Sequence, residues 1–130
     1  MALINTWCFT RTIILWDVLA EATHNKYRVV SVRKYTDKKE RLPDGYTLTL
    51  MVLKDDYEYG VDKNGEPRET NLYQSFDVTV LNRNKEVQKG DIVELVDFDS
   101  QNSYAIGFDL LLRFNDMNVI KPGTGGKTDA

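Results

Sequence analysis

The stretch YRVVSVRKY, residues 27–35, points to the fold class of this chain. It is rich in valine and tyrosine, and its partial alternation of apolar and polar residues is typical of a half-buried strand. Turn chemistry at Pro43-Asp44-Gly45 and at Asn64-Gly65 separates it from later stretches of the same kind. From Tyr27 onward the sequence therefore predicts an all-β chain, with further strands at residues 46–53, 71–81, 91–98, 104–113 and 117–120.

The first 24 residues have a different pattern, which is strongly apolar at Leu3-Ile4 and at Ile13-Ile14-Leu15-Trp16. We expect a strand near residues 4–10 and a helix near 12–23, although Thr10, Thr12 and the isoleucine pair equally suit a strand. Large apolar side chains in this segment most often pack in the core. If they were exposed instead, they would form a patch for self-association or for binding a partner. The side chains in question are Trp7, Phe9, Leu15 and Trp16, and the predicted helix face consists of Ile13, Trp16, Val18, Leu19 and Ala22.

Length and composition indicate one domain, because the chain has 130 residues of which 42% are hydrophobic. The longest apolar run is shorter than the roughly 18 residues of a membrane span, and no secretory signal pattern opens the chain. We therefore expect a cytoplasmic protein without a membrane partner. Cys8 is the only cysteine, which excludes an intrachain disulfide and a cysteine-rich zinc site. The predicted organisation is an apolar extension at 1–26, a β-barrel at 27–121 and a flexible tail at 122–130.

Strand alternation assigns each side chain to a face, since neighbouring residues of a strand point to opposite sides of the sheet. An error of one residue in the register would invert the assignment. The predicted inward side chains are Val30, Val32, Leu48, Leu50, Val52, Phe76, Val78, Val80, Val93 and Leu95. The predicted outward side chains are Tyr27, Arg33, Tyr35, Thr47, Thr49, Met51, Tyr73 and Ser75.

The stretch KGDIVEL, residues 89–95, resembles a recurring feature of OB-fold barrels, in which a Lys-Gly-Asp turn opens a strand with alternate apolar residues. It follows the predicted strand that ends at residues 78–81, as it does in many single-stranded-DNA-binding proteins. The layout over residues 27–121 resembles small OB-fold accessory proteins of phages and conjugative elements, including the helicase-processivity type. This resemblance implies a small OB-like barrel of five to six strands, with a short N-terminal helix or strand extension, that binds single-stranded nucleic acid across its face.

Aromatic and basic residues interleave along the predicted outward face. Bases stack on aromatic rings while lysine and arginine follow the phosphates, so this interleaving is what single-strand binding requires. The loop at 36–42 is the first barrel loop, which commonly lines the groove of an OB fold. In the alternative interpretation the tyrosines are ordinary strand residues and the loop is a solvated turn. The candidate nucleic-acid-binding residues are Tyr27, Arg33, Lys34, Tyr35, Lys38, Lys39, Arg41 and Tyr73.

Other groups of polar residues have a simpler explanation than catalysis. Asp62, Asn64 and Glu66 have a spacing seen among calcium ligands, but Gly65 does not stand where an EF-hand loop needs its glycine. A cysteine–histidine pair is limited to Cys8 with His24, and buried free cysteine usually behaves as a small hydrophobe. The acidic residues near predicted turns are typical of local backbone stabilisation rather than of a nuclease site, and they are Asp91, Asp97, Asp99, Asp109 and Asp116.

We therefore predict a protein that is not an enzyme and that uses no metal and no cofactor. The leading hypothesis is an accessory protein that binds single-stranded DNA and assists the replication or transfer of a mobile element. The alternative is a β-barrel protein-interaction module in a phage or transfer complex, without nucleic-acid binding. The net charge of −3 favours the alternative, and the basic loop favours the leading hypothesis. The expected partners are single-stranded DNA, a protein of a replication or transfer complex, and a second copy contacted through the N-terminal segment.

Overall fold

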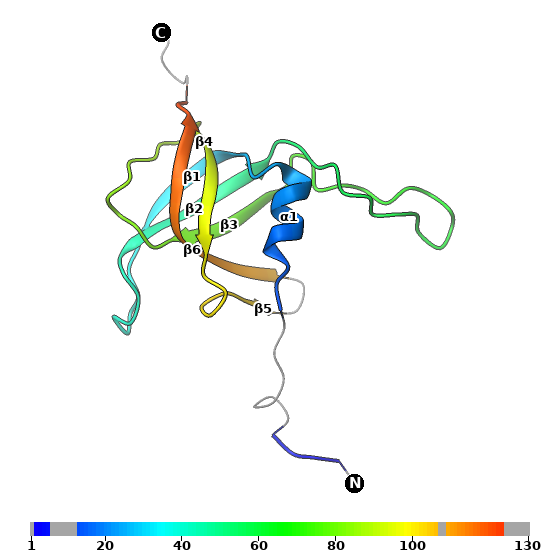
Figure 1. The fold of residues 1–130 in the computed structure, drawn as a ribbon, viewed down its shortest axis with the longest axis horizontal. Coiled ribbons are helices and arrows are strands. Elements are labelled where there is room, and N and C mark those ends of the chain that lie inside the picture. Colours follow the sequence, from blue (N-terminus) through cyan, green and yellow to red (C-terminus); the bar gives the residue numbers. More distant parts are fainter. Residues whose placement is uncertain (1, 6–12, 107–108, 124–130) are drawn as a thin grey trace.

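The computed structural model describes residues 2–5, 13–106 and 109–123, and it consists of one short helix and six strands (Figure 1). The elements are α1 (Trp16–Thr23), β1 (Tyr27–Tyr35), β2 (Gly45–Val52), β3 (Ser75–Val80), β4 (Ile92–Phe98), β5 (Tyr104–Ile106) and β6 (Asp109–Lys121). None of the described helices is long and apolar enough to cross a membrane. The predicted all-β class is confirmed.

Five of the strands close into a ring. β2 pairs with β1 and β3, β1 also pairs with β4, and β4 pairs with β6, all antiparallel. The ring is closed by a parallel pairing of β3 with β6 that runs from Val78↔Leu112 to Val80↔Phe114. The order β4-β1-β2-β3 is a Greek key. The chain is therefore a small Greek-key barrel, with β5 added to the outside of the ring by its pairing with β6.

The third and last strands differ from the sequence prediction at their ends. The strand expected at 71–81 begins only at Ser75, because Asn71 accepts a turn hydrogen bond from the backbone N–H of Gln74. The prediction of one strand at 104–113 and another at 117–120 is wrong, because the boundary between the two strands lies elsewhere. Residues 104–106 form β5, which pairs back on the start of β6, and β6 runs without a break from Asp109 to Lys121.

A β-bulge inverts part of the predicted outward face. The register of β1 against β2 shifts between Val29 and Ser31, so one extra residue is present in β1. Val30 was predicted to point inward but is exposed, whereas Tyr27 was predicted to point outward but is fully buried. After the bulge the predicted alternation holds, since Val32 packs against the core. The sequence carries no glycine or proline at this position that would have revealed the bulge.

The helix α1 is part of the core. The Trp16 ring contacts those of Phe114, Phe98 and Tyr27, with centroid distances of 4.7, 6.1 and 6.3 Å. The helix prediction at 12–23 is confirmed for residues 16–23, but Ile13 and Val18 are exposed rather than on its buried face. The strand expected at 4–10 lies mostly outside the described residues, and its described part, residues 4–5, is not in a strand.

The Lys-Gly-Asp turn attaches β4 to β1 next to the bulge. Gly90 donates its N–H to the carbonyl of Val29, and Val29 donates in turn to the carbonyl of Asp91. Gly90 has a φ of 97°, which an L side chain rarely adopts. The buried carboxylate of Asp91 accepts N–H groups from Gln88 and Gly123, so it also ties down the chain after β6.

Candidate functional site

The loop at 36–44, which joins β1 to β2, is organised by one carboxylate. Asp37 accepts backbone N–H groups from Arg41, Leu42 and Lys39 at 2.9, 3.2 and 3.4 Å. The hydrogen bond from the Arg41 backbone is the main reason why the pKa of Asp37 lies below its usual value, and the charge of Arg41 adds to the effect. The loop is thus held in a defined shape with its lysine and arginine side chains in solvent.

The end of the barrel that carries this loop is locally basic. Between residues 33 and 44 the chain has five cationic side chains and three carboxylates, so the local net charge is +2 although the whole chain carries −3. All five cationic residues are exposed. The structure therefore brings together most of the predicted basic residues: Arg33, Lys34, Lys38, Lys39 and Arg41.

Arg83, which sequence reasoning missed, belongs to the same end of the barrel. Its guanidinium donates to the carbonyls of Tyr35 at 2.6 Å and Gly45 at 3.0 and 3.2 Å, and lies 5.9 Å from the centre of the Tyr46 ring. It also lies 3.9 Å from Asp44. The residue sits in the β3–β4 connection, 48 positions from Tyr35, and no local pattern in the sequence signals this contact.

Arg33 is less available for contact with a phosphate than the lysines of the loop. Its guanidinium donates to the hydroxyl of Thr49 and lies 3.5 Å from the carboxylate of Asp77, to which Thr49 also donates. This network crosses β1, β2 and β3 on the outer face, and it neutralises the cation that was expected to meet a phosphate there. The middle of the β1–β2–β3 face is therefore a closed polar network rather than a basic surface.

Two predicted contact residues do not join the basic end. The fully buried Tyr27 shares a 2.6 Å hydrogen bond with Thr23, and burial raises the pKa of Tyr27 to about 12 although this hydrogen bond lowers it in part. Tyr73 is exposed, but its backbone N–H bonds to Val52, which pairs with Tyr27. The distance along β1 from Tyr27 to Tyr35 is about 26 Å at ~3.3 Å per residue. Tyr35, half-buried, is the predicted aromatic residue that remains beside the loop.

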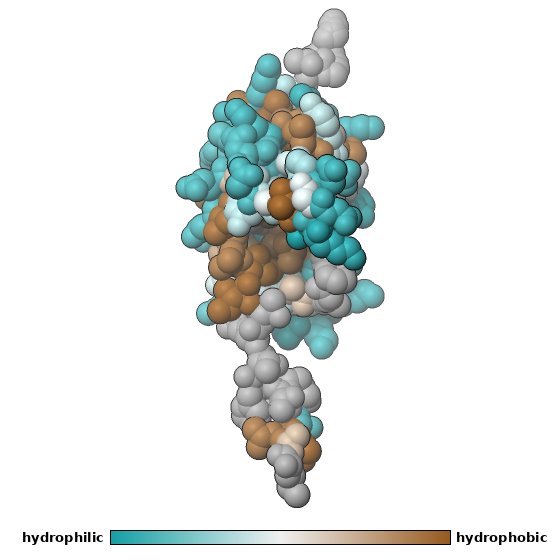
Figure 2. Space-filling model, turned by 90° about the vertical axis from the view of Figure 1, so that its right-hand side faces the viewer, coloured by the Kyte–Doolittle hydropathy of each residue, from teal (hydrophilic) through white to brown (hydrophobic). Residues whose placement is uncertain are grey.

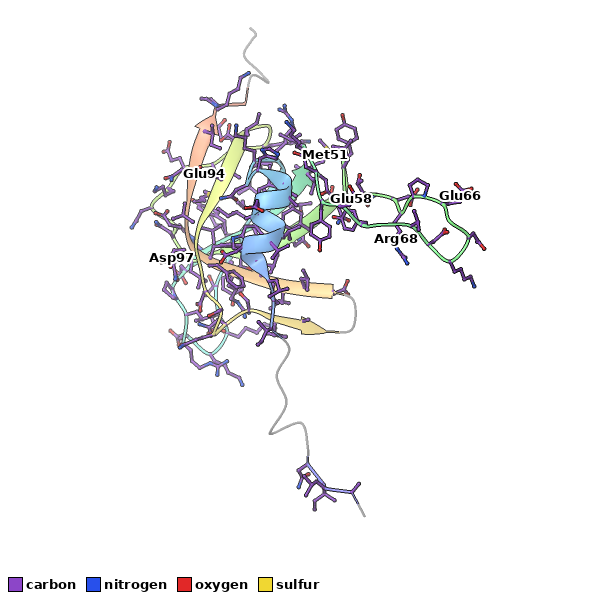
Figure 3. All side chains as sticks on the ribbon, turned by 45° about the vertical axis from the view of Figure 1, so that its right-hand side comes forward. Met51, Glu58, Glu66, Arg68, Glu94 and Asp97 are labelled. Carbon is purple, nitrogen blue, oxygen red and sulfur yellow. The ribbon has the colours of Figure 1, made fainter. Side chains whose placement is uncertain are left out.

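A long arm between β2 and β3 carries the opposite charge. Residues 53–74 contain six carboxylates and three cationic side chains, a net charge of −3. The arm projects from the end of the β1–β2 pair opposite to the basic loop, and Glu58, Arg68 and Glu66 lie along it at increasing distance from the barrel (Figures 1 and 3). The molecule is therefore electrostatically polarised, with the basic segment 33–44 at one end and an acidic arm at the other.

The carboxylates of the arm stabilise its own backbone. Asp62 accepts N–H groups from Asn64 and Glu66 and so closes the tip around Gly65. At the base, Asp55 accepts from the Tyr59 hydroxyl at 2.7 Å and from the Asn71 N–H at 2.8 Å. Desolvation raises the pKa of Asp55, but these hydrogen bonds outweigh it and the pKa lies below its usual value.

The other acidic residues singled out in the sequence do not cluster, and several of them accept hydrogen bonds from nearby residues, as the carboxylates of the arm do. Asp99 accepts from Asn102, and Asp97 from Asn115. Asp116 accepts the Met117 N–H, which does most to lower its pKa, and lies 3.3 Å from the ammonium of Lys85. His24 pairs with Asp56 at 2.5 Å, while Cys8 lies outside the described residues.

An apolar groove of about 870 Å³ opens between β3 and β6. The described pairs between these parallel strands end at Val78↔Leu112, and the strands diverge before that point. Most of the lining comes from residues 74–79 of the β3 region, from residues 109–112 of β6 and from Leu19 and Thr23 of α1, and Thr47 and Thr49 of β2 are also part of it. Figure 2 faces this side of the molecule and shows apolar residues around a recess beside the hydrophilic arm.

The comparisons with known proteins identify no relative. No family model matches the chain, and neither the curated proteins nor the solved structures contain a significant match.

Proposed function

We propose that this protein binds single-stranded nucleic acid, DNA in the first place, through the basic end of its barrel. The observation that carries the proposal is the segregation of charge: residues 33–44, which are the end of β1 and the following loop, have a net charge of +2 and stand opposite an arm with a net charge of −3. A phosphate backbone is attracted to the first and repelled by the second, so the two ends would orient the strand. The five-stranded Greek-key ring is also the architecture of the OB fold, whose first loop commonly contacts oligonucleotides.

The contact surface is smaller than the one predicted from the sequence. It consists of Lys34, Lys38, Lys39 and Arg41, with Tyr35 as the stacking platform. One half-buried tyrosine offers little stacking energy, since a base–aromatic stack is worth about 1–3 kcal/mol. Phosphate contacts would then supply most of the affinity, and binding would be weak at physiological salt and strongly salt-dependent. The role as an accessory protein in replication or transfer of a mobile element rests on the resemblance alone.

The test is a titration of the full chain with fluorescent oligo-dT, followed by anisotropy over a series of salt concentrations. Each phosphate contact to a single strand contributes about 0.7 to the slope of log affinity against log salt. The double variant Lys38→Ala/Lys39→Ala should therefore flatten the slope by up to ~1.4. The matched control is Lys54→Ala/Lys63→Ala, which makes the same charge change on the arm and should leave the slope unaltered. Absence of binding at low salt, or equal slopes in the two variants, contradicts the proposal.

The alternative function, a protein-interaction module without nucleic-acid binding, is favoured by the apolar groove. In the part of the chain that the structure describes, the charged residues lining it are Asp77 and Asp109, so it would repel a phosphate backbone and suits a polypeptide instead. Failure of oligo-dT to bind would make this alternative the better one.

A further inference from the structure

We propose that the groove between β3 and β6 receives the N-terminal segment, residues 2–13, of a second copy of this chain. The segment would add as a strand beside β3, and the protein would form a dimer by strand exchange. This inference does not depend on nucleic-acid binding, because the groove and the basic loop share no residue.

The backbone of the groove is suited to an added strand. Had the parallel register of β3 and β6 continued, Phe76 would pair with Leu110 and Asp77 with Leu111. Among the described residues no such pair is formed, so residues 75–77 of β3 are paired with β2 on one side and face the groove on the other. A strand edge with free N–H and C=O groups is a template for a further strand.

The side chains of the groove offer an apolar surface with an acidic margin. Phe76, Leu111 and Leu19 are half-buried, and Leu110 is 45% exposed. Among the described residues, the charged side chains that line the groove are the carboxylates of Asp77, which pairs with Arg33, and of Asp109. The groove therefore fits an extended segment with alternating apolar side chains and a positive charge.

The N-terminal segment has this chemistry. In its described parts, Leu3, Ile4 and Ile13 are 81%, 80% and 76% exposed, so the chain itself leaves these side chains without a core. The sequence TWCFTRT, residues 6–12, alternates large or charged residues with small ones and is rich in residues that favour strands. Arg11 is the only charged residue of the segment and complements the carboxylate of Asp109 in the groove.

The geometry favours a second copy over the chain's own segment. Trp16 is fixed in the core at the start of α1, and residues 2–5 lie away from the barrel (Figure 1). The chain thus presents an uncovered groove and, at a distance from it, an exposed apolar segment. In a dimer, the segment of each copy would cover the groove of the other. The same two surfaces then meet twice, as a two-fold dimer requires.

The experiment is sedimentation velocity of the full chain over a range of concentrations. We expect a dimer, and we expect Leu110→Arg to raise its dissociation constant more than about tenfold by placing a charge in the apolar contact. The matched control is Ile120→Arg, because Ile120 is 44% exposed on the same strand but lies outside the groove, and it should change the constant less than about threefold.

A mixing experiment distinguishes strand exchange from any other dimer. The double variant Trp7→Asp/Phe9→Asp retains the groove but has a defective segment, whereas Leu110→Arg retains the segment but has a defective groove. Each variant alone should be monomeric, and their mixture should form a heterodimer held by one intact contact. A monomeric wild type, a dimer that survives Leu110→Arg, or variants that fail to complement each other would overturn the inference.

Discussion

Replacement of Trp16 by alanine tests whether α1 is an integral part of the barrel or an appendage of it. Trp16 is 7% exposed and lies within ring contact of Phe114, Phe98 and Tyr27. Truncation of a buried aromatic side chain typically costs about 3–5 kcal/mol, because it removes apolar burial and leaves a cavity. For a chain of this size we take about 4 °C of melting temperature per kcal/mol, so the expected decrease is roughly 12–20 °C.

The assay is urea unfolding of Trp16→Ala followed by far-UV circular dichroism, with the thermal melt as a second measure. Leu15→Ala is the matched control, since Leu15 precedes Trp16 but is 67% exposed, and its cost should stay below about 0.5 kcal/mol. A loss of less than about 1 kcal/mol for Trp16→Ala would refute the reasoning. It would show that the barrel keeps its core without the helix.

Two further predictions concern the barrel itself. The pKa of Tyr27, raised to about 12 by burial, predicts that stability is retained up to about pH 10, the usual tyrosine value. Stability should fall between pH 10 and pH 12, because the unfolded chain loses this proton first. In pH-dependent urea unfolding the fall should be smaller for Tyr27→Phe, and the remainder belongs to Tyr59, whose pKa is also raised. Gly45→Ala should destabilise by more than about 2 kcal/mol, since a Cβ at Gly45 would collide with the carbonyl oxygen of Val80 on the paired strand. A melting temperature of Gly45→Ala equal to that of the wild type would contradict the second prediction.

The sequence predicted the strands well where alternation and turn residues agree. β1, β2 and β4 begin and end within a residue of their predicted bounds. The faces were predicted correctly for β2, where Leu48, Leu50 and Val52 are buried as expected. They were wrong at the start of β1, where a bulge lies beside the docked Lys-Gly-Asp turn and no residue type within β1 signals it.

The candidate site was predictable only in its local part. Lys38, Lys39 and Arg41 are close in sequence to one another and to Asp37, which shapes their loop, so one short segment contains the cluster. Tyr73 was grouped with them because a strand was predicted from residue 71, whereas Tyr73 lies in the turn before β3 with a φ of 65°, next to Val52 at the far end of the barrel. The position follows from register, and register depends on pairing between distant segments.

The position of β6 in the ring has a consequence for the newly made chain. It is the last of the six strands in chain order, and it pairs with both β3 and β4 to close the barrel. Because synthesis proceeds from the N-terminus at about 5–20 residues per second, β3 and β4 are complete before their shared neighbour exists. During that interval the nascent sheet has two open edges, which neighbouring nascent chains on the same messenger can pair with.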